Sequence, residues 1–243
     1  MLILLPPSET KRSGGVGISI DKAAIIWAAL DPARDKLIAA LERLSENPDL
    51  ASKALKLGRK SLGELAHNQQ LYKSPTMPAL ERYSGVLYEA LSYESLSSAA
   101  VKRANETLFI QSALFGLLPA MEQIPNYRLS ASSKLPGINL RELWMEAHQA
   151  VWPRMVGEIV DLRSSDYRFI NPVPEDKKSF VMEVFSEEGR ALNHFNKKAK
   201  GLFVRSALEN GLESASDIPK VAKLAGLRAE IEGQTVKLFT PSL

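Results

Sequence analysis

The side chains of this sequence that suit binding chemistry are mainly cations and hydroxyls, and they occur in separate short stretches. Cations and hydroxyl groups bind phosphate and carboxylate groups through charge-assisted hydrogen bonds. The residues concerned are Ser8, Thr10, Lys11, Arg128, Arg163, Ser165, Tyr167, Lys197 and Lys198. The pattern predicts a site for an anion, provided that the fold brings these stretches together.

The most basic stretch runs from Arg190 to Arg205 and is expected to be a helix. Its apolar residues recur every three or four positions, and its opposite face is basic with no acid inside the segment. Gly201 interrupts the basic face, where it costs roughly 1 kcal/mol of helix stability relative to Ala. Charged helix faces are usually only solvated. The alternative is that Lys197 and Lys198 contact phosphates and that Gly201 is the point where a ligand comes closest.

Two further stretches suit anions. The apolar strand Leu2 to Leu5 ends at Pro6-Pro7 and leads into the glycine-rich loop PSETKRSGGVG, which lacks the spacing of a P-loop. Leu57 to Lys60, which includes Arg59, forms a basic, glycine-containing turn between two expected helices. Such turns offer backbone N–H groups to a phosphate in helix-hairpin-helix modules, but an ordinary helical hairpin fits as well.

A third stretch follows the strand expected over 158–162. Arg163, Ser165 and Tyr167 come directly after it, and polar groups at the end of a strand often line a crevice at the carboxyl edge of a sheet. Arg128 lies in a short extended segment, where a salt bridge with Asp161 or Asp166 is the simpler alternative to ligand binding.

Several kinds of chemistry lack support. The chain has no cysteine, which excludes thiol catalysis, thiolate metal sites and disulfides. His67, His148 and His194 have no metal-ligand spacing, and a packed or partly exposed side chain is the simpler interpretation of His148. No dinucleotide fingerprint or nucleophile elbow occurs. We therefore expect no cofactor and no metal.

The elements that must position these groups are mostly helical. Helices are expected over 31–47, 48–57, 61–72, 77–91, 97–105, 139–152, 190–205 and from 217, and strands over 2–5, 107–118, 158–162, 178–187, 227–231 and 235–239. With no repeat or linker, the pattern predicts one α/β domain over 1–243, with a central mixed sheet and many surrounding helices.

The composition is that of an ordinary globular protein, with 45% hydrophobic residues, 24% charged residues and a net charge of +3. No apolar run approaches the roughly 18 residues that a membrane span needs. We expect no membrane contact and a cytoplasmic location.

The ordered blocks of the sequence resemble the YaaA peroxide-stress family over nearly the whole chain. The blocks are MLILLPPSETK at the start, the series Tyr83, Gly85, Val86, Tyr88, then ALFGLL at 113–118, Tyr127-Arg128-Leu129, Leu143-Trp144, RSSDY at 163–167 and KKAKG at 197–201. The resemblance implies the so-called cantaloupe-type α/β fold and a cytoplasmic role in the response to hydrogen peroxide that limits iron-dependent damage. It also implies DNA binding through a positively charged groove and a hairpin-like element.

The family blocks place expected binding residues at particular positions of this chain. They are Ser8, Lys11, Arg59, Lys60, Arg128, Ser165, Tyr167, Lys197, Lys198 and Gly201. Asp166 replaces a glutamate of the family pattern. Lys200 replaces an arginine and so loses the bidentate fork.

Two functions follow from these observations. In the first, the basic stretches line a groove that neutralises the phosphates of DNA, with an affinity that falls steeply with salt. In the second, Ser8, Arg128, Ser165 and Tyr167 meet beside Lys197 in a pocket of an enzyme that acts on a small phosphorylated or nucleotide-like substrate. Convergence of Arg128, Tyr167 and Lys197 in one cavity would favour the enzyme.

Overall fold

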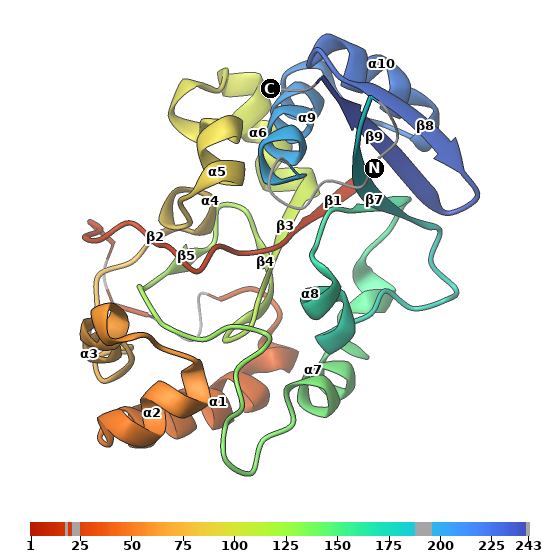
Figure 1. The fold of residues 1–243 in the computed structure, drawn as a ribbon. Helices are drawn as coiled ribbons and strands as arrows, with labels where there is room; N and C mark the ends of the chain where they lie inside the picture. The colour runs from red at the N-terminus through yellow and green to blue at the C-terminus, as the bar shows by residue number, and fades with distance from the viewer. Residues whose placement is uncertain (18, 21–24, 188–195, 242–243) are drawn as a thin grey trace.

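A seven-stranded mixed sheet forms the centre of the part of the chain that the structure describes (Figure 1). This computed structural model describes residues 1–17, 19–20, 25–187 and 196–241. The strand order is β4-β3-β1-β6-β7-β9-β8. The strands are β1 Leu2–Leu5, β3 Leu108–Ser112, β4 Gly116–Pro119, β6 Ile159–Asp161, β7 Ser179–Ser186, β8 Arg228–Glu232 and β9 Thr235–Thr240, and a small separate pair joins β2 Met77–Pro78 to β5 Gln123–Ile124.

The centre of the sheet is parallel and its two edges are antiparallel. β1 lies between β3 and β6, and its Ile3 is in register with Leu108 on one side and Val160 on the other. A parallel strand covered on both faces is expected to be a continuous apolar run, and β1 is one, with Ile3 to Leu5 fully buried. The strand predicted at residues 2–5 is therefore confirmed.

The apolar run expected as one strand over 107–118 is a hairpin of β3 and β4. Ser112 ends β3, and its Oγ accepts hydrogen bonds from the backbone N–H groups of Leu114 and Phe115. Gly116 begins β4 with φ of 75°, and a Cβ there would lie 2.9 Å from the Trp144 ring. Hydrophobic periodicity cannot reveal a tight turn inside a fully buried run.

Helices surround the sheet, with α1, α2 and α7 at the bottom of Figure 1 and α9 and α10 at the top. The α-helices are α1 Asp31–Ser45, α2 Pro48–Leu55, α3 Leu65–Asn68, α4 Ala79–Arg82, α5 Val86–Leu91, α6 Ser98–Thr107, α7 Leu140–His148, α8 Ser165–Ile170, α9 Asn196–Asn210 and α10 Ile218–Leu224. Short 3-10 helices are η2 Ala28–Leu30, η3 Arg59–Glu64, η4 Tyr93–Ser95, η5 Trp152–Arg154 and η6 Ala215–Asp217.

Side-chain caps begin three of the helices whose ranges were predicted. Asn47, Ser97 and Asn139 accept hydrogen bonds from backbone N–H groups in the first turns of α2, α6 and α7. The helix expected over 61–72 is mostly absent, because Ser61 lies inside η3 and only the short α3 follows.

The helix expected over 77–91 is also divided. Its first two residues form β2, and α4 and α5 are separated by the segment Tyr83 to Gly85. Gly85 precedes α5 with φ of 97°, a conformation that the right-handed helix does not allow. The break places Tyr83 beside the loop that follows β1, and this contact builds the candidate site.

Candidate anion-binding site

The carboxyl end of β1 is the point where the strand order of the sheet reverses. The chain passes from β1 to β3 on one side and later returns to β6 on the other. In open α/β sheets the crevice outside such a point is the usual place for a ligand. The loop that follows β1 leads to Lys11, and the segment after β6 holds Arg163 and Ser165, so two of the predicted stretches meet this edge. In Figure 1 the red chain leaving β1 runs toward β2 and β5.

Lys11 is the central side chain of this site. Its backbone forms a bridge with Tyr83, and its Nζ lies 5.6 Å from the centroid of the Tyr83 ring and 4.3 Å from that of Tyr127. The Nζ donates one hydrogen bond, to the backbone carbonyl of Glu9 at 3.3 Å. Lys11 is half-buried, so the ammonium group loses much of its hydration and gains one neutral acceptor in return.

Burial lowers the pKa of Lys11 from 10.5 to about 7, with a smaller contribution from the positive charge of Arg128, while Glu64 and Glu9 act in the opposite direction. A lowering of this size corresponds to about 5 kcal/mol against the charged form. The aromatic faces favour the ammonium ion by roughly 0.5–2 kcal/mol. Burial is the larger effect, so a substantial share of Lys11 is a neutral amine at neutral pH.

The two tyrosines beside Lys11 form a row of three hydroxyl groups with Ser112. Tyr127 Oη is 2.8 Å from Ser112 Oγ and 2.8 Å from Tyr83 Oη. Because Ser112 Oγ already accepts two backbone N–H groups, its proton points to Tyr127, and the proton of Tyr127 points to Tyr83. Burial raises the pKa of both tyrosines above the ordinary value, so the row stays neutral.

Arg128 supplies the second cation of the site. Asn68 fixes its backbone through two hydrogen bonds, at 2.7 and 3.0 Å. Its guanidinium lies 2.9 Å from Glu9 and 3.5 Å from Glu64, and its Nε is buried without a hydrogen-bond partner in the described structure. The salt-bridge partners of Arg128 are therefore these two glutamates. The alternative drawn from the sequence, a salt bridge of Arg128 with Asp161 or Asp166, is wrong.

Ser8 lies on the other side of the loop, next to Gly85. A cavity of about 200 Å³ is lined there by Ser8, Thr10, Gly85, Tyr88 and Lys197, among others. A Cβ at Gly85 would lie 3.3 Å from Ser8 Oγ, so a side chain at this position would crowd that hydroxyl. Ser8 and Lys197, which are distant in the sequence, thus share one cavity.

The described basic side chains of the expected helix over 190–205 lie in different environments. Lys197 and Lys198 are exposed, as predicted, but Lys200 is buried and its Nζ donates to the Leu162 carbonyl at 3.0 Å. Burial lowers the pKa of Lys200 to about 8. Arg205 donates to the backbone carbonyls of Leu91 and Ser92 at the end of α5. The part of this stretch over 190–195 lies outside the described residues.

Gly201 faces another helix. A Cβ at this position would lie 2.2 Å from the Leu87 carbonyl oxygen and 2.8 Å from the Ala90 Cβ, both in α5. The interpretation that Gly201 lies on the basic face and admits a ligand is therefore corrected. The approach of the α5 backbone occupies that space.

The residues after β6 have mixed roles. Arg163 is buried, and its guanidinium forms a bidentate pair with Asp161 at 2.7 and 2.9 Å, so it is a structural residue. Ser165 is exposed at the rim of a separate cavity of about 360 Å³ that Lys200 also lines. Tyr167 is half-buried, and burial raises the pKa of its hydroxyl. Arg128, Tyr167 and Lys197 do not line one common cavity among those described.

The turn at residues 57–60 leads from α2 into η3 instead of joining two α-helices. The side chains of Arg59 and Lys60 lie outside the described part of the structure.

His148 is the packed histidine that the sequence favoured, because its Nε2 accepts from the Leu117 N–H and its Nδ1 donates to the Trp144 carbonyl.

Sequence reasoning missed Glu9, Glu64 and Ser112 as parts of the site. Ser112 was inside an apolar run, and the glutamates carry a charge opposite to the one sought. Tyr83 was noted only as part of a family block and a buried helix face. Only the tertiary structure identifies these four residues as parts of the site. Each contacts Lys11, Tyr127 or Arg128 across a distance in the chain that no local pattern covers.

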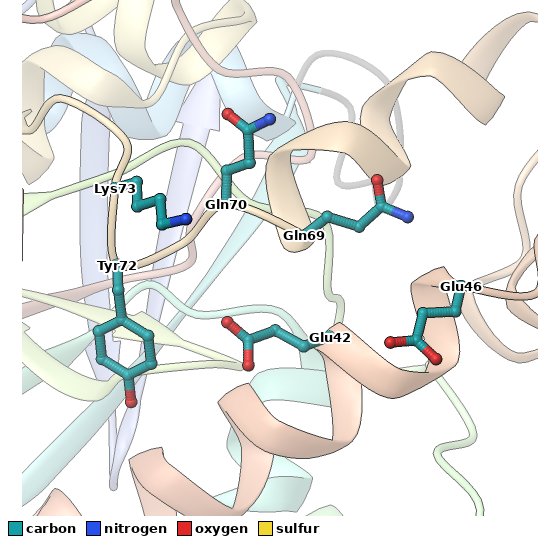
Figure 2. A pocket seen from close by; sticks show the side chains of 6 residues that line it. All are labelled: Glu42, Glu46, Gln69, Gln70, Tyr72 and Lys73. Atoms are coloured by element: carbon teal, nitrogen blue, oxygen red, sulfur yellow. The ribbon is translucent and has the colours of Figure 1, made fainter.

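A second hollow lies away from these residues, between α1 and the segment after α3. Figure 2 shows Glu42 and Glu46 of α1 facing Gln69, Gln70, Tyr72 and Lys73 across a volume of about 450 Å³. Its side chains are exposed or half-buried, and none belongs to the predicted anion-binding set.

No helix in residues 1–17, 19–20, 25–187 and 196–241 is long and apolar enough to cross a membrane. The same residues contain no group of three or more His, Cys, Asp or Glu side chains placed to hold a metal ion.

The fold and the clustered residues define an open, mixed α/β protein with cations and hydroxyls at the carboxyl end of its central strand. Comparison with known proteins narrows this class. Residues 1–232 match the family model described as peroxide stress protein YaaA, and the chain belongs to that family. It is 39% identical over 239 residues to a UPF0246 protein of Corynebacterium efficiens, covering 95% of each chain. It is 34% identical over 241 residues to a UPF0246 protein of Streptomyces coelicolor, covering 96% of this chain and 93% of the relative.

Proposed function

We propose that this member of the peroxide stress family binds a small ligand carrying a phosphate or carboxylate group at Lys11 and Arg128. The observation that supports the proposal is the position of Lys11, half-buried against Tyr127 and close enough to Arg128 for the two charges to interact. Holding two cations together in a partly desolvated place is costly unless an anion offsets their repulsion. Glu9 and Glu64 offset part of it in the described structure.

The size and polarity of the surroundings favour a small ligand. The cavity of about 200 Å³ on the other side of the loop, which Lys11 and Arg128 do not line, offers the hydroxyls of Ser8 and Thr10 and the ammonium of Lys197. A titratable group with a strongly lowered pKa in such a place is a common feature of functional sites. The surroundings therefore support the binding of a small phosphorylated or nucleotide-like ligand. An enzyme acting on it would depend on Lys11, because Arg128, Tyr167 and Lys197 do not line one common cavity among those described.

Calorimetric titration with inorganic phosphate tests this proposal. We expect Lys11→Met and Arg128→Gln each to weaken phosphate binding about tenfold or more, because a charge-assisted hydrogen bond contributes about 1.5–3 kcal/mol. Lys36→Met, at an exposed lysine of α1, is the matched control and should bind as the wild type does. Unchanged binding by the Lys11 and Arg128 variants would refute the assignment.

A second candidate function is binding of the DNA backbone, through which the protein would shield DNA and limit iron-dependent damage. The supporting observation is that Lys197 and Lys198 are both exposed on the first turns of α9, and that Lys197 lines the same cavity as Ser8. Adjacent exposed lysines beside backbone and hydroxyl donors suit phosphates without reading bases. The burial of Lys200 and the internal bonding of Arg205 make this surface smaller than the sequence suggested.

The salt dependence of duplex DNA binding tests the second candidate. Removal of two phosphate contacts should reduce the log-log slope by about 1.8. We expect this change for the double variant Lys197→Ala with Lys198→Ala. The double variant Lys220→Ala with Lys223→Ala removes two exposed lysines of α10 and should leave the slope unchanged. Equal slopes for both variants would exclude Lys197 and Lys198 as the DNA contacts.

A further inference from the structure

We propose that Lys11 is a nucleophile that forms an imine with an aldehyde or ketone whose carboxylate or phosphate group is held by Arg128. This inference deepens the proposed function and rests on it. It assigns a covalent step to the lysine and a chemical class to the small ligand.

The position of the Lys11 amine is the first argument. Its Nζ lies over the Tyr127 and Tyr83 rings and donates to one backbone carbonyl, that of Glu9. No carboxylate within the described structure forms a salt bridge with it, although Glu9 and Glu64 both reach the neighbouring Arg128. A lysine that serves only as a cation would be expected to take one of these carboxylates. Here the guanidinium takes both.

The groups around Lys11 favour the free amine, which is the reactive form. The charged and titratable groups near it are Glu9 on its own loop, Glu64 at the end of η3, His67 in α3, Arg82 and Tyr83 at the end of α4, and Tyr127 and Arg128 in the extended segment. Burial and the positive charge of Arg128 lower the pKa of the amine to about 7. A lysine beside another cation and shielded from water is a known route to a reactive amine.

The anionic part of the substrate follows from Arg128. The Arg128 side chain is 12% exposed, and the side chain of its partner Glu9 is 65% exposed on the loop. A carboxylate or phosphate of the ligand can replace Glu9 there, where Glu9 accepts one hydrogen bond from the guanidinium at 2.9 Å. The carbonyl group of that ligand then lies near the amine, because Arg128 is close enough to Lys11 for its charge to act on that amine.

The chemical step is balanced without a further reactant. The lone pair of the neutral Lys11 nitrogen attacks the carbonyl carbon, and the carbonyl π electrons move to oxygen to give a carbinolamine. The C–O bond then breaks, and the oxygen leaves as water with the two protons of the original amine. A C=N bond joins Lys11 to the substrate, with no change in oxidation state.

Reductive trapping tests the inference. The full-length protein is incubated with pyruvate or glyceraldehyde 3-phosphate and sodium cyanoborohydride, and peptide mass spectrometry locates the secondary amine. At pH 7 the free-amine share of Lys11 should exceed that of an ordinary lysine roughly 1000-fold. We therefore expect Lys11 to be labelled faster than the exposed lysines and faster than Lys200 and the Met1 α-amine, with a labelling rate that is half-maximal near pH 7. Lys197 and Lys198 serve as exposed controls in the same molecule.

Matched variants and probes complete the experiment. Lys11→Arg keeps the cation but has no nucleophilic amine, so it should lose the label and still bind phosphate. Arg128→Gln should slow labelling by the two anionic probes more than labelling by propanal, which has no charge and is affected only through the Lys11 pKa. Labelling of Lys11 no faster than of Lys197 would overturn the inference. Phosphate binding without any Lys11 label would overturn the inference and leave the proposed function standing, whereas the absence of both would overturn both.

Discussion

The glycine in α9 allows the strongest test of the structural interpretation. In Gly201→Ala the new Cβ would meet the Leu87 carbonyl oxygen at 2.2 Å and the Ala90 Cβ at 2.8 Å. Real contacts of this kind do not fall below about 3 Å, so α5 and α9 must move apart by roughly 1 Å or distort. The obstructing atom is backbone, and Arg205 holds the end of α5 by two hydrogen bonds, so a side-chain rotation cannot relieve the clash.

Two effects of opposite sign set the size of the change. Alanine favours an isolated helix over glycine by about 1 kcal/mol. Overpacking a close contact costs about 1–3 kcal/mol, and sometimes more. Since the contact is between helix backbones, we expect the upper part of that range and a net loss of about 1–2 kcal/mol. For a chain of this size, the loss lowers Tm by about 2–8 °C.

Urea unfolding followed by tryptophan fluorescence measures the change. Gly63→Ala is the matched control, because Gly63 is in η3 and a Cβ there meets nothing within 4 Å. We expect that control to be as stable as the wild type or slightly more stable. A Gly201→Ala protein with wild-type stability and weakened phosphate binding would refute the packing argument and restore the ligand-approach interpretation.

Three other outcomes are expected. Asp161→Asn leaves the buried Arg163 guanidinium without its countercharge and should reduce the free energy of unfolding by about 3–5 kcal/mol in urea titrations; a loss below 1 kcal/mol would contradict the pairing. Lys11 has a folded pKa of about 7 against 10.5 unfolded, so the unfolded state binds more protons between these values. The stability of the wild type relative to Lys11→Met should therefore rise from pH 7 to about 9.5, by at most about 1.4 kcal/mol per pH unit, and a flat difference in thermal scans would argue against a buried amine. Glu9→Gln removes a negative charge that pairs with Arg128, so Arg128 becomes more available to phosphate. Phosphate affinity measured by calorimetry should rise up to about fivefold, whereas weaker binding would show that Glu9 supports the site.

Local signals in the sequence predicted most elements well. The apolar run of β1, the asparagine caps of α2 and α7 and the C-terminal hairpin depend on residues within a few positions of one another. Elements that depend on distant contacts were predicted less well. The division of 77–91 and the turn inside 107–118 both occur where the chain packs against another segment, at Lys11 for the first and at Trp144 for the second.

The candidate site shows the same limit. Residue types in the sequence were enough to select Lys11, Arg128 and Lys197 as candidate anion binders, which stays a prediction, and to exclude thiol chemistry. Whether a given cation is free or used internally depends on burial and partners. That is why Arg163 and Lys200 are structural in the fold, whereas Lys197 remains exposed.

The sequence by itself determined the mixed α/β class, the positions of most strands and caps, and the kind of ligand chemistry available to the chain. These properties follow from hydrophobic periodicity, capping and side-chain type, which act locally. The tertiary structure alone decided that Gly201 faces α5, that Glu9 occupies Arg128, and that Lys11 lies over Tyr127. Each of these facts depends on desolvation and packing between segments that are distant in the chain, and no local pattern encodes those contacts.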